Sequence, residues 1–210
     1  MLGEKIMCDS IIFDMDGTLV NFLDEMLVSW NLTCKNHGWN KVIEFDELKR
    51  CMGLNGHDIG VIMFPDVDED EATRRVEICS AEEITYFDEV KIGKTYIPNE
   101  DFLVKLSKKH KLFIVSNCLE GYIEIFLKKY NYGKYFVDFA NAANGNTKAQ
   151  NIKMIVEKHN LKTPVYVGDT PKDLESSLEA NVRFIYASYG FQDVDWNEKI
   201  SSLEDLLEIL

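Results

Sequence analysis

Residues 10–18 read SIIFDMDGT and join a short apolar run to two acidic residues and a glycine. The run at residues 10–13 has the composition of a buried strand. Asp14 and Asp16 follow it, and a strand that continued in the same direction would point both side chains to one side. Gly17 then allows a sharp turn. Because ligands bind beyond the carboxyl ends of parallel strands, this stretch predicts an acidic site. A strand-ending acidic turn without chemistry is the alternative.

A second stretch, residues 165–173 (VYVGDTPKD), again places acids after an apolar run. Thr170 is a candidate N-cap with Pro171 at the first helical position, and Asp173 two residues further on can close a capping box. Asp173 therefore has a structural explanation as a residue that favours a helix N-terminus. Asp169 has no such explanation, because it precedes the cap at the strand end.

The rest of the chain alternates strands and helices. Helical patterns cover residues 121–130 and 149–159. Five apolar runs are typical of buried strands, at residues 10–13, 112–115, 135–139, 165–167 and 182–186. This alternation predicts an α/β fold with a parallel sheet that helices cover on both faces.

Residues 20–95 separate the first strand from the second and far exceed a single crossover helix. Their patterns are helical: Asp46 is a candidate cap of a short helix, and residues 70–90 predict a long charged helix. The sequence therefore predicts a core domain from residues 1–19 and 96–210, with residues 20–95 inserted as a helical cap domain.

Composition limits the classes of partner. The chain has 210 residues, 46% of them hydrophobic, so it can bury a core of one or two domains. Its formal net charge of −13 argues against binding to nucleic acid or to an anionic membrane. An acidic surface also gives no long-range attraction to a phosphorylated substrate, so an anion site must be built locally from Lys, backbone N–H groups and a cation.

Cysteine usage and hydropathy predict a cytoplasmic location. The cysteines are odd in number and form no C-x-x-C pair, which suits reduced thiols better than disulfides or a zinc site. The five are Cys8, Cys34, Cys51, Cys79 and Cys118. No apolar run approaches the length of a membrane span, and the run near the start is too short for a signal sequence, so we expect no contact with a membrane.

Three acids at two strand ends predict a cation. If both strands are central, Asp14, Asp16 and Asp169 converge, and they cannot all stay ionised without a positive charge between them. Oxygen ligands of this kind point to Mg²⁺, which is typically held by one or two carboxylates together with a substrate phosphate.

Two further stretches could bind an anion. Ser116 and Asn117 follow a predicted strand and offer a hydroxyl and an amide, although both types are common in loops. Residues 147–150 (TKAQ) form a capping box that places Lys148 at the start of a helix. A lysine there is usually a solvated side chain, but with an anion opposite it would act together with the helix N–H groups.

The four stretches, in this order, resemble the motifs of the haloacid dehalogenase superfamily. Residues 14–18 resemble motif I, residues 116–117 motif II, Lys148 motif III and residues 168–173 motif IV. Each motif alone is common, but the four in register are specific and span nearly the whole core. The resemblance implies a Rossmann-like core and identifies the insertion as a C1-type helical cap.

The resemblance also implies roles for the acids. Asp14 would attack phosphorus, and Asp16 would protonate the leaving oxygen and then activate water. Asp14, Asp169 and the backbone carbonyl of Asp16 would bind Mg²⁺, with Asp173 in or near its outer shell.

The remaining motif residues would bind the phosphoryl group. Ser116 and Lys148 would stabilise its charge during transfer, and Gly17, Thr18 and Asn117 would complete the phosphate site.

Departures from the family pattern narrow the branch. Dehalogenases and phosphonatases of the superfamily usually lack the second acid of motif I, so Asp16 points to phosphate esters. Met26 stands where β-phosphoglucomutase-like members carry histidine, which weakens a mutase interpretation. Residues 21–22 (NF) replace the polar pair of many capped phosphatases. We therefore expect a phosphatase similar to phosphoglycolate phosphatase.

Two alternatives remain open. A phosphotransferase or sugar phosphomutase would share the chemistry, and a catalytically silent binding protein would keep only the fold, although the chain retains its motif acids and lysine. The sequence leaves the phosphate ester and the oligomeric state undetermined. Candidates for contact with the leaving group are Arg50, Asn55 and His57, because nearby glycines predict a loop.

Overall fold

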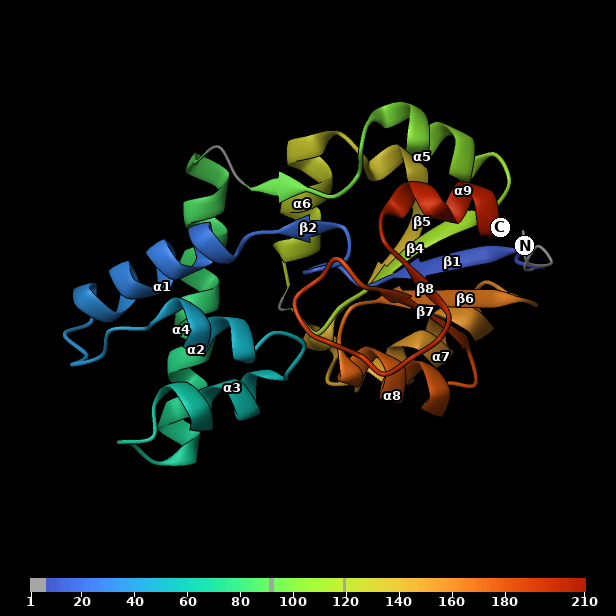
Figure 1. Cartoon of the computed structure of the whole chain (residues 1–210). Coiled ribbons are helices and arrows are strands. Elements are labelled where there is room, and N and C mark those ends of the chain that lie inside the picture. Colours follow the sequence, from blue (N-terminus) through green and yellow to red (C-terminus); the bar gives the residue numbers. More distant parts are fainter. Residues whose placement is uncertain (1–6, 91–92, 119) are drawn as a thin grey trace. The chain divides into compact units, whose positions relative to one another are not determined.

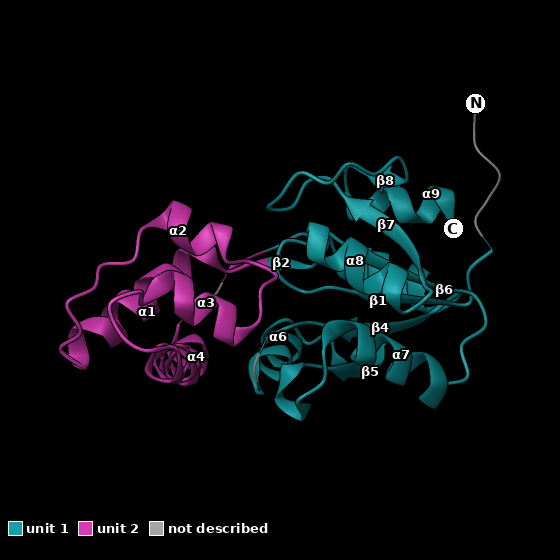
Figure 2. Ribbon diagram, turned by 90° about the horizontal axis from the view of Figure 1, so that it is seen from below, with its two compact units in different colours: residues 1–20, 95–210 teal, residues 21–94 magenta. Residues whose placement is uncertain are grey.

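The computed structural model describes residues 7–90, 93–118 and 120–210. The chain divides into two compact units, shown in different colours in Figure 2. Met1–Val20 and Thr95–Leu210 form the first, here called the core unit. Asn21–Lys94 form the second, here called the inserted unit. One polypeptide therefore contributes two separated segments to the core unit.

The core unit is built on a six-stranded sheet in the order β5-β4-β1-β6-β7-β8. All its neighbouring strands run parallel. The strands are β1 (Ser10–Phe13), β4 (Lys111–Val115), β5 (Phe136–Ala140), β6 (Pro164–Gly168), β7 (Arg183–Ala187) and β8 (Lys199–Ile200). A separate two-stranded sheet consists of β2 (Val20–Asn21) and β3 (Lys94–Thr95). The predicted α/β fold with a parallel sheet is confirmed.

Helices cover both faces of the large sheet. Figure 1 shows α7 and α8 on one face and α5 and α9 on the other. The helices of the core unit are α5 (Glu100–Ser107), α6 (Tyr122–Tyr130), α7 (Lys148–Lys158), α8 (Pro171–Glu179) and α9 (Leu206–Ile209). The short 3-10 helices of the described core residues are η1 (Gly133–Tyr135), η2 (Ala142–Asn144) and η3 (Leu203–Asp205). This layered arrangement leaves the carboxyl ends of the strands as the edge where polar groups can gather.

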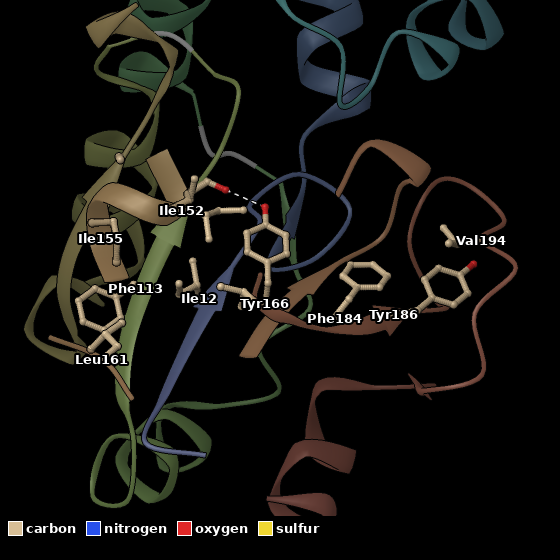
Figure 3. Packing of buried hydrophobic residues seen from close by; sticks show 12 residues of the cluster. Ile12, Phe113, Ile152, Ile155, Leu161, Tyr166, Phe184, Tyr186 and Val194 are labelled. Carbon is tan, nitrogen blue, oxygen red and sulfur yellow. Dashed lines mark hydrogen bonds between the residues drawn. The ribbon is translucent and has the colours of Figure 1, made fainter. Parts of the chain in front are cut away.

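A row of large side chains packs across four strands on the face toward α7. Phe113, Ile12, Tyr166 and Phe184 are register partners in turn across β4, β1, β6 and β7, and each is fully buried. Figure 3 shows them in one cluster with side chains of α7. Burying each contributes about 1.5–3 kcal/mol. Because strand residues alternate between faces, this row also sets the direction of Asp14, which lies two residues beyond Ile12 on the same face.

The inserted unit is helical, as predicted. It contains α1 (Leu23–Asn36), α2 (Phe45–Arg50), α3 (Gly56–Met63) and α4 (Glu69–Glu89). The predicted long charged helix is α4, and it packs against α1 and α3. The prediction of Asp46 as a cap is wrong. Glu44 is the N-cap of α2 and shares a capping box with Glu47, so Asp46 lies inside the first turn.

Candidate active site

The path of the chain through the sheet defines a switch point beside β1. From β1 the chain moves outward through β4 to β5, then returns to β6 on the other side of β1. Ligands of open α/β sheets bind in the crevice at such a reversal. Asp14 follows β1 and Asp169 follows β6, so both acids lie at the carboxyl ends that border the switch point. The Asp14 N–H donates to the Val167 carbonyl at 2.8 Å, which fixes its backbone to β6.

Lys148 joins two of the predicted acids. Its Nζ donates to Asp14 Oδ1 at 2.8 Å and to Asp173 Oδ1 at 2.7 Å, and the lysine is only 3% exposed. Lys148 is the first residue of α7, where the predicted capping box is confirmed. The Thr147 hydroxyl accepts from the Gln150 N–H, and the Thr147 N–H donates to Gln150 Oε1. The cap therefore fixes the helix start from which Lys148 reaches both carboxylates.

Both oxygens of Asp173 accept several hydrogen bonds. Oδ1 accepts from Lys148 and from the Tyr166 hydroxyl at 3.2 Å. Oδ2 accepts from the N–H and hydroxyl of Thr170 at 3.0 and 2.7 Å and from the Asp169 N–H at 3.2 Å. The predicted capping box at the start of α8 is confirmed. With this many donors, Asp173 is suited to orient its neighbours.

Asp169 is packed between two glycines and held by two donors. The Thr18 hydroxyl donates to Oδ1 at 3.3 Å and the Phe191 N–H donates to Oδ2 at 2.7 Å. A Cβ on Gly17, whose φ is +80°, would lie 2.1 Å from the Asp169 carboxylate, and one on Gly190 would lie 2.2 Å from its Cβ. A side chain at either glycine would displace Asp169.

Gly17 and Thr18, predicted phosphate-binding residues, have protein partners. The Gly17 N–H donates to the Val20 carbonyl at 2.8 Å, and the Thr18 N–H donates to the Met15 carbonyl at 3.2 Å. The Thr18 side chain is fully buried against Asp169. These contacts shape the turn after β1.

Asp16 has a different environment from Asp14. It is half-buried, and its Oδ1 accepts a hydrogen bond from the Tyr122 hydroxyl at 2.9 Å. Tyr122 is the first residue of α6, far away in the sequence. The two motif I acids therefore have separate donors, Lys148 for Asp14 and Tyr122 for Asp16.

Ser116 and Asn117 lie where β4 ends. The Ser116 N–H donates to the Ala140 carbonyl at 3.1 Å, and its side chain is 4% exposed. Its hydroxyl accepts from the Cys118 N–H at 3.4 Å. Asn117 is half-buried. Because β4 pairs with β1, these polar groups end at the same edge of the sheet as Asp14.

Burial shifts the pKa values of the acids upward. Desolvation, reinforced by the charge of Asp173, raises the pKa of Asp14 to about 7, and desolvation raises that of Asp16 to about 6. Burial and the same neighbouring charge raise the pKa of Asp169 well above its usual range. Burial lowers the pKa of Lys148, but the adjacent carboxylates outweigh it and hold that pKa above its ordinary value. If all these acids were ionised, their charge would exceed what one ammonium group neutralises, which adds to the effect of burial in raising their pKa values.

The residues present fit a divalent cation. Carboxylate oxygens of Asp14, Asp169 and Asp173 lie within 4.8 Å of one another. An oxygen-only donor set of this kind is suited to Mg²⁺. Among the residues that the structure describes, Lys148 donates to Asp14 Oδ1 and no donor holds Asp14 Oδ2.

Sequence reasoning missed the donors that surround the acids. The segment between β7 and β8 contributes Gly190 and Phe191 beside Asp169, and the Tyr189 hydroxyl donates to the Thr18 carbonyl at 2.8 Å. The sequence pattern predicts Tyr122 and Tyr166 only as members of an apolar helix face and an apolar strand. The sequence signal for the donors near Asp169 is Gly190 between Tyr189 and Phe191, just after the predicted strand at residues 182–186.

The candidate leaving-group residues of the inserted unit have local partners. Asn55 is the N-cap of α3 and accepts from the Asp58 N–H at 2.9 Å. The His57 ring lies 3.4 Å from carboxylate oxygens of Asp58 and Glu69. Arg50 donates to a main-chain carbonyl of its own helix at 3.1 Å. Their part in substrate selection stays a prediction.

A parallel α/β sheet with acids gathered at its switch point is the architecture of a large class of enzymes, and comparison with known proteins narrows the class. The chain matches the haloacid dehalogenase-like hydrolase family over residues 11–187. It therefore belongs to this family, and the predicted superfamily is confirmed. A search of curated proteins finds no match.

Solved structures share the fold at low sequence identity. A hydrolase of the haloacid dehalogenase-like family from Streptococcus pneumoniae is 18% identical with a TM-score of 0.79, covering 95% of this chain and 97% of its own. A predicted phosphatase from Clostridium acetobutylicum is 19% identical with a TM-score of 0.78 and coverages of 95% and 96%. A predicted phosphoglycolate phosphatase from Haemophilus somnus is 19% identical with a TM-score of 0.79 and coverages of 96% and 97%.

Within residues 7–90, 93–118 and 120–210, no helix combines the length and apolar character needed to cross a bilayer.

Proposed function

We propose that this hydrolase is a Mg²⁺-dependent phosphatase that cleaves a small phosphate ester through a phosphoryl group carried on Asp14. The observation that supports it is the state of Asp14: a buried carboxylate at the switch point whose Oδ1 is held by Lys148 while Oδ2 has no protein donor among the described residues. A nucleophile needs an oriented carboxylate with one oxygen free to react.

In the first step Asp14 Oδ2 attacks phosphorus in line with the leaving oxygen. The bond between phosphorus and that oxygen breaks, and Asp16 donates a proton to the oxygen as it departs. The raised pKa of Asp16, about 6, suits a group that must hold a proton and then release it near neutral pH.

In the second step water attacks the phosphorus of the Asp14 acyl phosphate. Asp16, now ionised, accepts a proton from this water, the bond from phosphorus to Asp14 breaks, and inorganic phosphate leaves. Lys148 stabilises negative charge on the transferring group, with Ser116 and Asn117 as further donors. After the second step Asp14 is free and Asp16 is protonated again, so turnover requires only the ester and water as reactants.

The acids would also hold the metal. Asp14, Asp169 and the backbone carbonyl of Asp16 would bind Mg²⁺, and Asp173, already engaged by five donor groups, would orient the site from the outer shell. The ion would neutralise charge on the phosphoryl oxygens. For Thr18 and Gly17 we propose a supporting role in the turn, because their polar groups have protein partners.

We further propose that residues 20–95 act as a cap that selects the leaving group, while residues 1–19 and 96–210 carry the chemistry. The substrate would be a small phosphorylated metabolite, as the name of the Haemophilus somnus protein suggests for phosphoglycolate. A phosphotransferase or mutase would use the same acyl phosphate but pass it to a hydroxyl group instead of water. The products separate these outcomes.

The test is a screen of phosphate esters in Mg²⁺, scored by release of inorganic phosphate and repeated in excess chelator. A quench during turnover should trap enzyme that carries one phosphoryl group on the peptide containing Asp14. Mass spectrometry should detect this group, and hydroxylamine should remove it. Asp16→Asn should accumulate this species with p-nitrophenyl phosphate, whose leaving group needs no proton.

Two controls complete the design. Asp14→Asn should form no phosphorylated peptide, and Asp24→Asn, in the first turn of α1, should behave as the wild type. Full activity in chelator, or a phosphoryl group on another residue, would refute the proposal. Transfer of phosphate to an added alcohol without release of inorganic phosphate would establish the phosphotransferase instead.

A further inference from the structure

The phenol of Tyr122 is placed against Asp16 by tertiary packing. The hydroxyl donates to Asp16 Oδ1 at 2.9 Å across 106 residues of sequence. The side chain is only 5% exposed, although Tyr122 is the first residue of its helix, a position that is commonly solvated. A buried tyrosine hydroxyl normally has a partner, and here an acid of motif I is one.

The start of α6 holds this phenol on a rigid element. Gly121 is the N-cap, and its φ of +92° lies in the left-handed region that favours glycine. The next turns of α6 bury Ile123, Ile125 and Phe126. Rotation of the helix about its axis would expose these apolar side chains, so the position of Tyr122 is determined by the core and not by the loop that precedes it.

The hydrogen bond constrains a torsion that is otherwise soft. The terminal torsion of an aspartate is broad and roughly two-fold, so an unrestrained carboxyl exchanges its two oxygens. A donor fixed on Oδ1 removes this freedom and leaves Oδ2 as the oxygen able to face a reacting group. Positioning of this kind matters in catalysis, because a displacement of about 1 Å can cost on the order of 100-fold in rate.

We propose that Tyr122 is a positioning residue that holds the Asp16 carboxyl by Oδ1, so that Oδ2 exchanges the proton with the leaving oxygen and with water. The inference rests on the proposed function, since it assigns no reaction of its own. Tyr122 acts through Asp16 and need not touch the substrate. Its effect must therefore follow the demand for proton transfer.

Aryl leaving groups of different basicity vary that demand. Phenyl phosphate releases a basic phenolate that needs a proton, whereas p-nitrophenyl phosphate releases a stabilised phenolate that does not. Tyr122→Phe keeps the ring and removes only the hydroxyl. We expect it to lower kcat/KM for phenyl phosphate about 10-fold and for p-nitrophenyl phosphate less than about 2-fold.

A matched control is Tyr135→Phe. The Tyr135 hydroxyl donates to Glu100 Oε1 at 2.6 Å, so this change also removes a phenol from a carboxylate, but Tyr135 precedes β5 and thus lies at the opposite ends of the strands from Asp16. It should leave the ratio of the two kcat/KM values unchanged. The ratio is independent of the fraction of folded enzyme, so partial unfolding of a variant cannot imitate the result.

Asp16→Asn separates failure of this inference from failure of the proposed function. If Asp16→Asn lowers kcat/KM equally for the two substrates, the assignment of Asp16 as the acid is wrong. If Asp16→Asn shows the leaving-group dependence and Tyr122→Phe does not, only the inference about Tyr122 is overturned. In the double variant, Tyr122→Phe should lower kcat/KM for phenyl phosphate by less than about 2-fold beyond the loss caused by Asp16→Asn alone. Multiplicative losses would show that Tyr122 acts by another route and would also overturn the inference.

Discussion

The core unit and the inserted unit differ in how they bury charge. Among its described residues, the core unit buries four charged side chains at the carboxyl ends of its strands, namely Asp14, Lys148, Asp169 and Asp173. The inserted unit buries one among its described residues, Glu83 of α4, which accepts a hydrogen bond from the Trp30 indole N–H. Burial of this glutamate accompanies helix packing, whereas the acids of the core unit are drawn together despite mutual repulsion.

This difference shows which unit contains the electrostatically unfavourable arrangement of charges. Desolvated carboxylates at close range cost free energy that a purely structural core would avoid. In the core unit this cost is partly offset by Lys148 and by N–H donors. Strongly shifted groups with a specific charge partner mark functional sites. The comparison supports the proposal that the core unit carries the chemistry, and five predictions test it.

The largest effect should come from Asp14→Asn. The amide is nearly isosteric but cannot act as the nucleophile, so kcat should fall more than about 100-fold, a loss of several kcal/mol in transition-state stabilisation. The measurement is turnover of p-nitrophenyl phosphate, with circular dichroism to show an intact fold. A variant that kept more than about one hundredth of wild-type kcat would rule out the covalent mechanism.

Lys148→Met should be the next largest and should affect both rate and stability. It leaves Asp14 and Asp173 without their shared cation, and breaking a buried pair in this way costs about 3–5 kcal/mol. Urea unfolding of the metal-free protein measures this loss in the free energy of unfolding. The matched control is Lys172→Met, because Lys172 pairs with Glu175 on the surface and its loss should change little. Equal effects of the two would mean that Lys148 is not balancing buried charge.

Stability of the metal-free protein should depend on pH through its acids with raised pKa values, Asp14 and Asp16 among them. Their pKa values, about 7 and about 6, lie above the ordinary 3.8, so the folded state binds more protons than the unfolded state. This contribution is fully present below about pH 4 and is lost as pH rises through 6 and 7, by up to about 1.4 kcal/mol per pH unit for each group.

The measurement is urea unfolding in chelator between pH 4 and pH 8. Asp14→Asn should flatten the decline, because it removes one of the titrating groups, and saturating Mg²⁺ should reduce it by stabilising the ionised acids. A wild-type decline that persisted unchanged in Asp14→Asn would place its origin elsewhere.

Replacement of residues 21–94 by a short Gly/Ser linker should weaken selectivity by about 10-fold, or about 1.4 kcal/mol, while p-nitrophenyl phosphate hydrolysis falls less. The reason is that a cap would contact the leaving group and not the phosphoryl group. The readout is the ranking of natural phosphate esters against this aryl ester, with thermal denaturation as the control for folding. An unchanged ranking in a folded variant would move specificity into the core unit.

The smallest effect should come from Glu83→Gln. The amide keeps an oxygen to accept from the Trp30 indole, so kcat for p-nitrophenyl phosphate should change less than about 2-fold. This variant is the counterpart of Asp14→Asn in the other unit, because each converts a buried acid to its amide. A loss of kcat comparable to that of Asp14→Asn would erase the distinction between the units.

Much of the fold was predictable because its signals are local. The five apolar runs became β1, β4, β5, β6 and β7 with ends shifted by at most one residue. The capping boxes at Thr147 and Thr170 also formed as their spacing predicted. Asp46 shows the limit of such signals, because aspartate is the better cap by preference but Glu44 had the reciprocal partner in Glu47.

The convergence of the acids at one edge of the sheet follows from their positions in the sequence. Asp14 and Asp169 each follow a short apolar run, and in a parallel sheet this local pattern suffices to bring both to one edge. Which donor holds which oxygen depends instead on how helices and loops pack in the folded protein. Tyr122 reaches Asp16 across 106 residues and Phe191 reaches Asp169 across 22. A hydrogen bond depends on distances of tenths of an ångström, and helix and loop packing sets these while residue spacing does not.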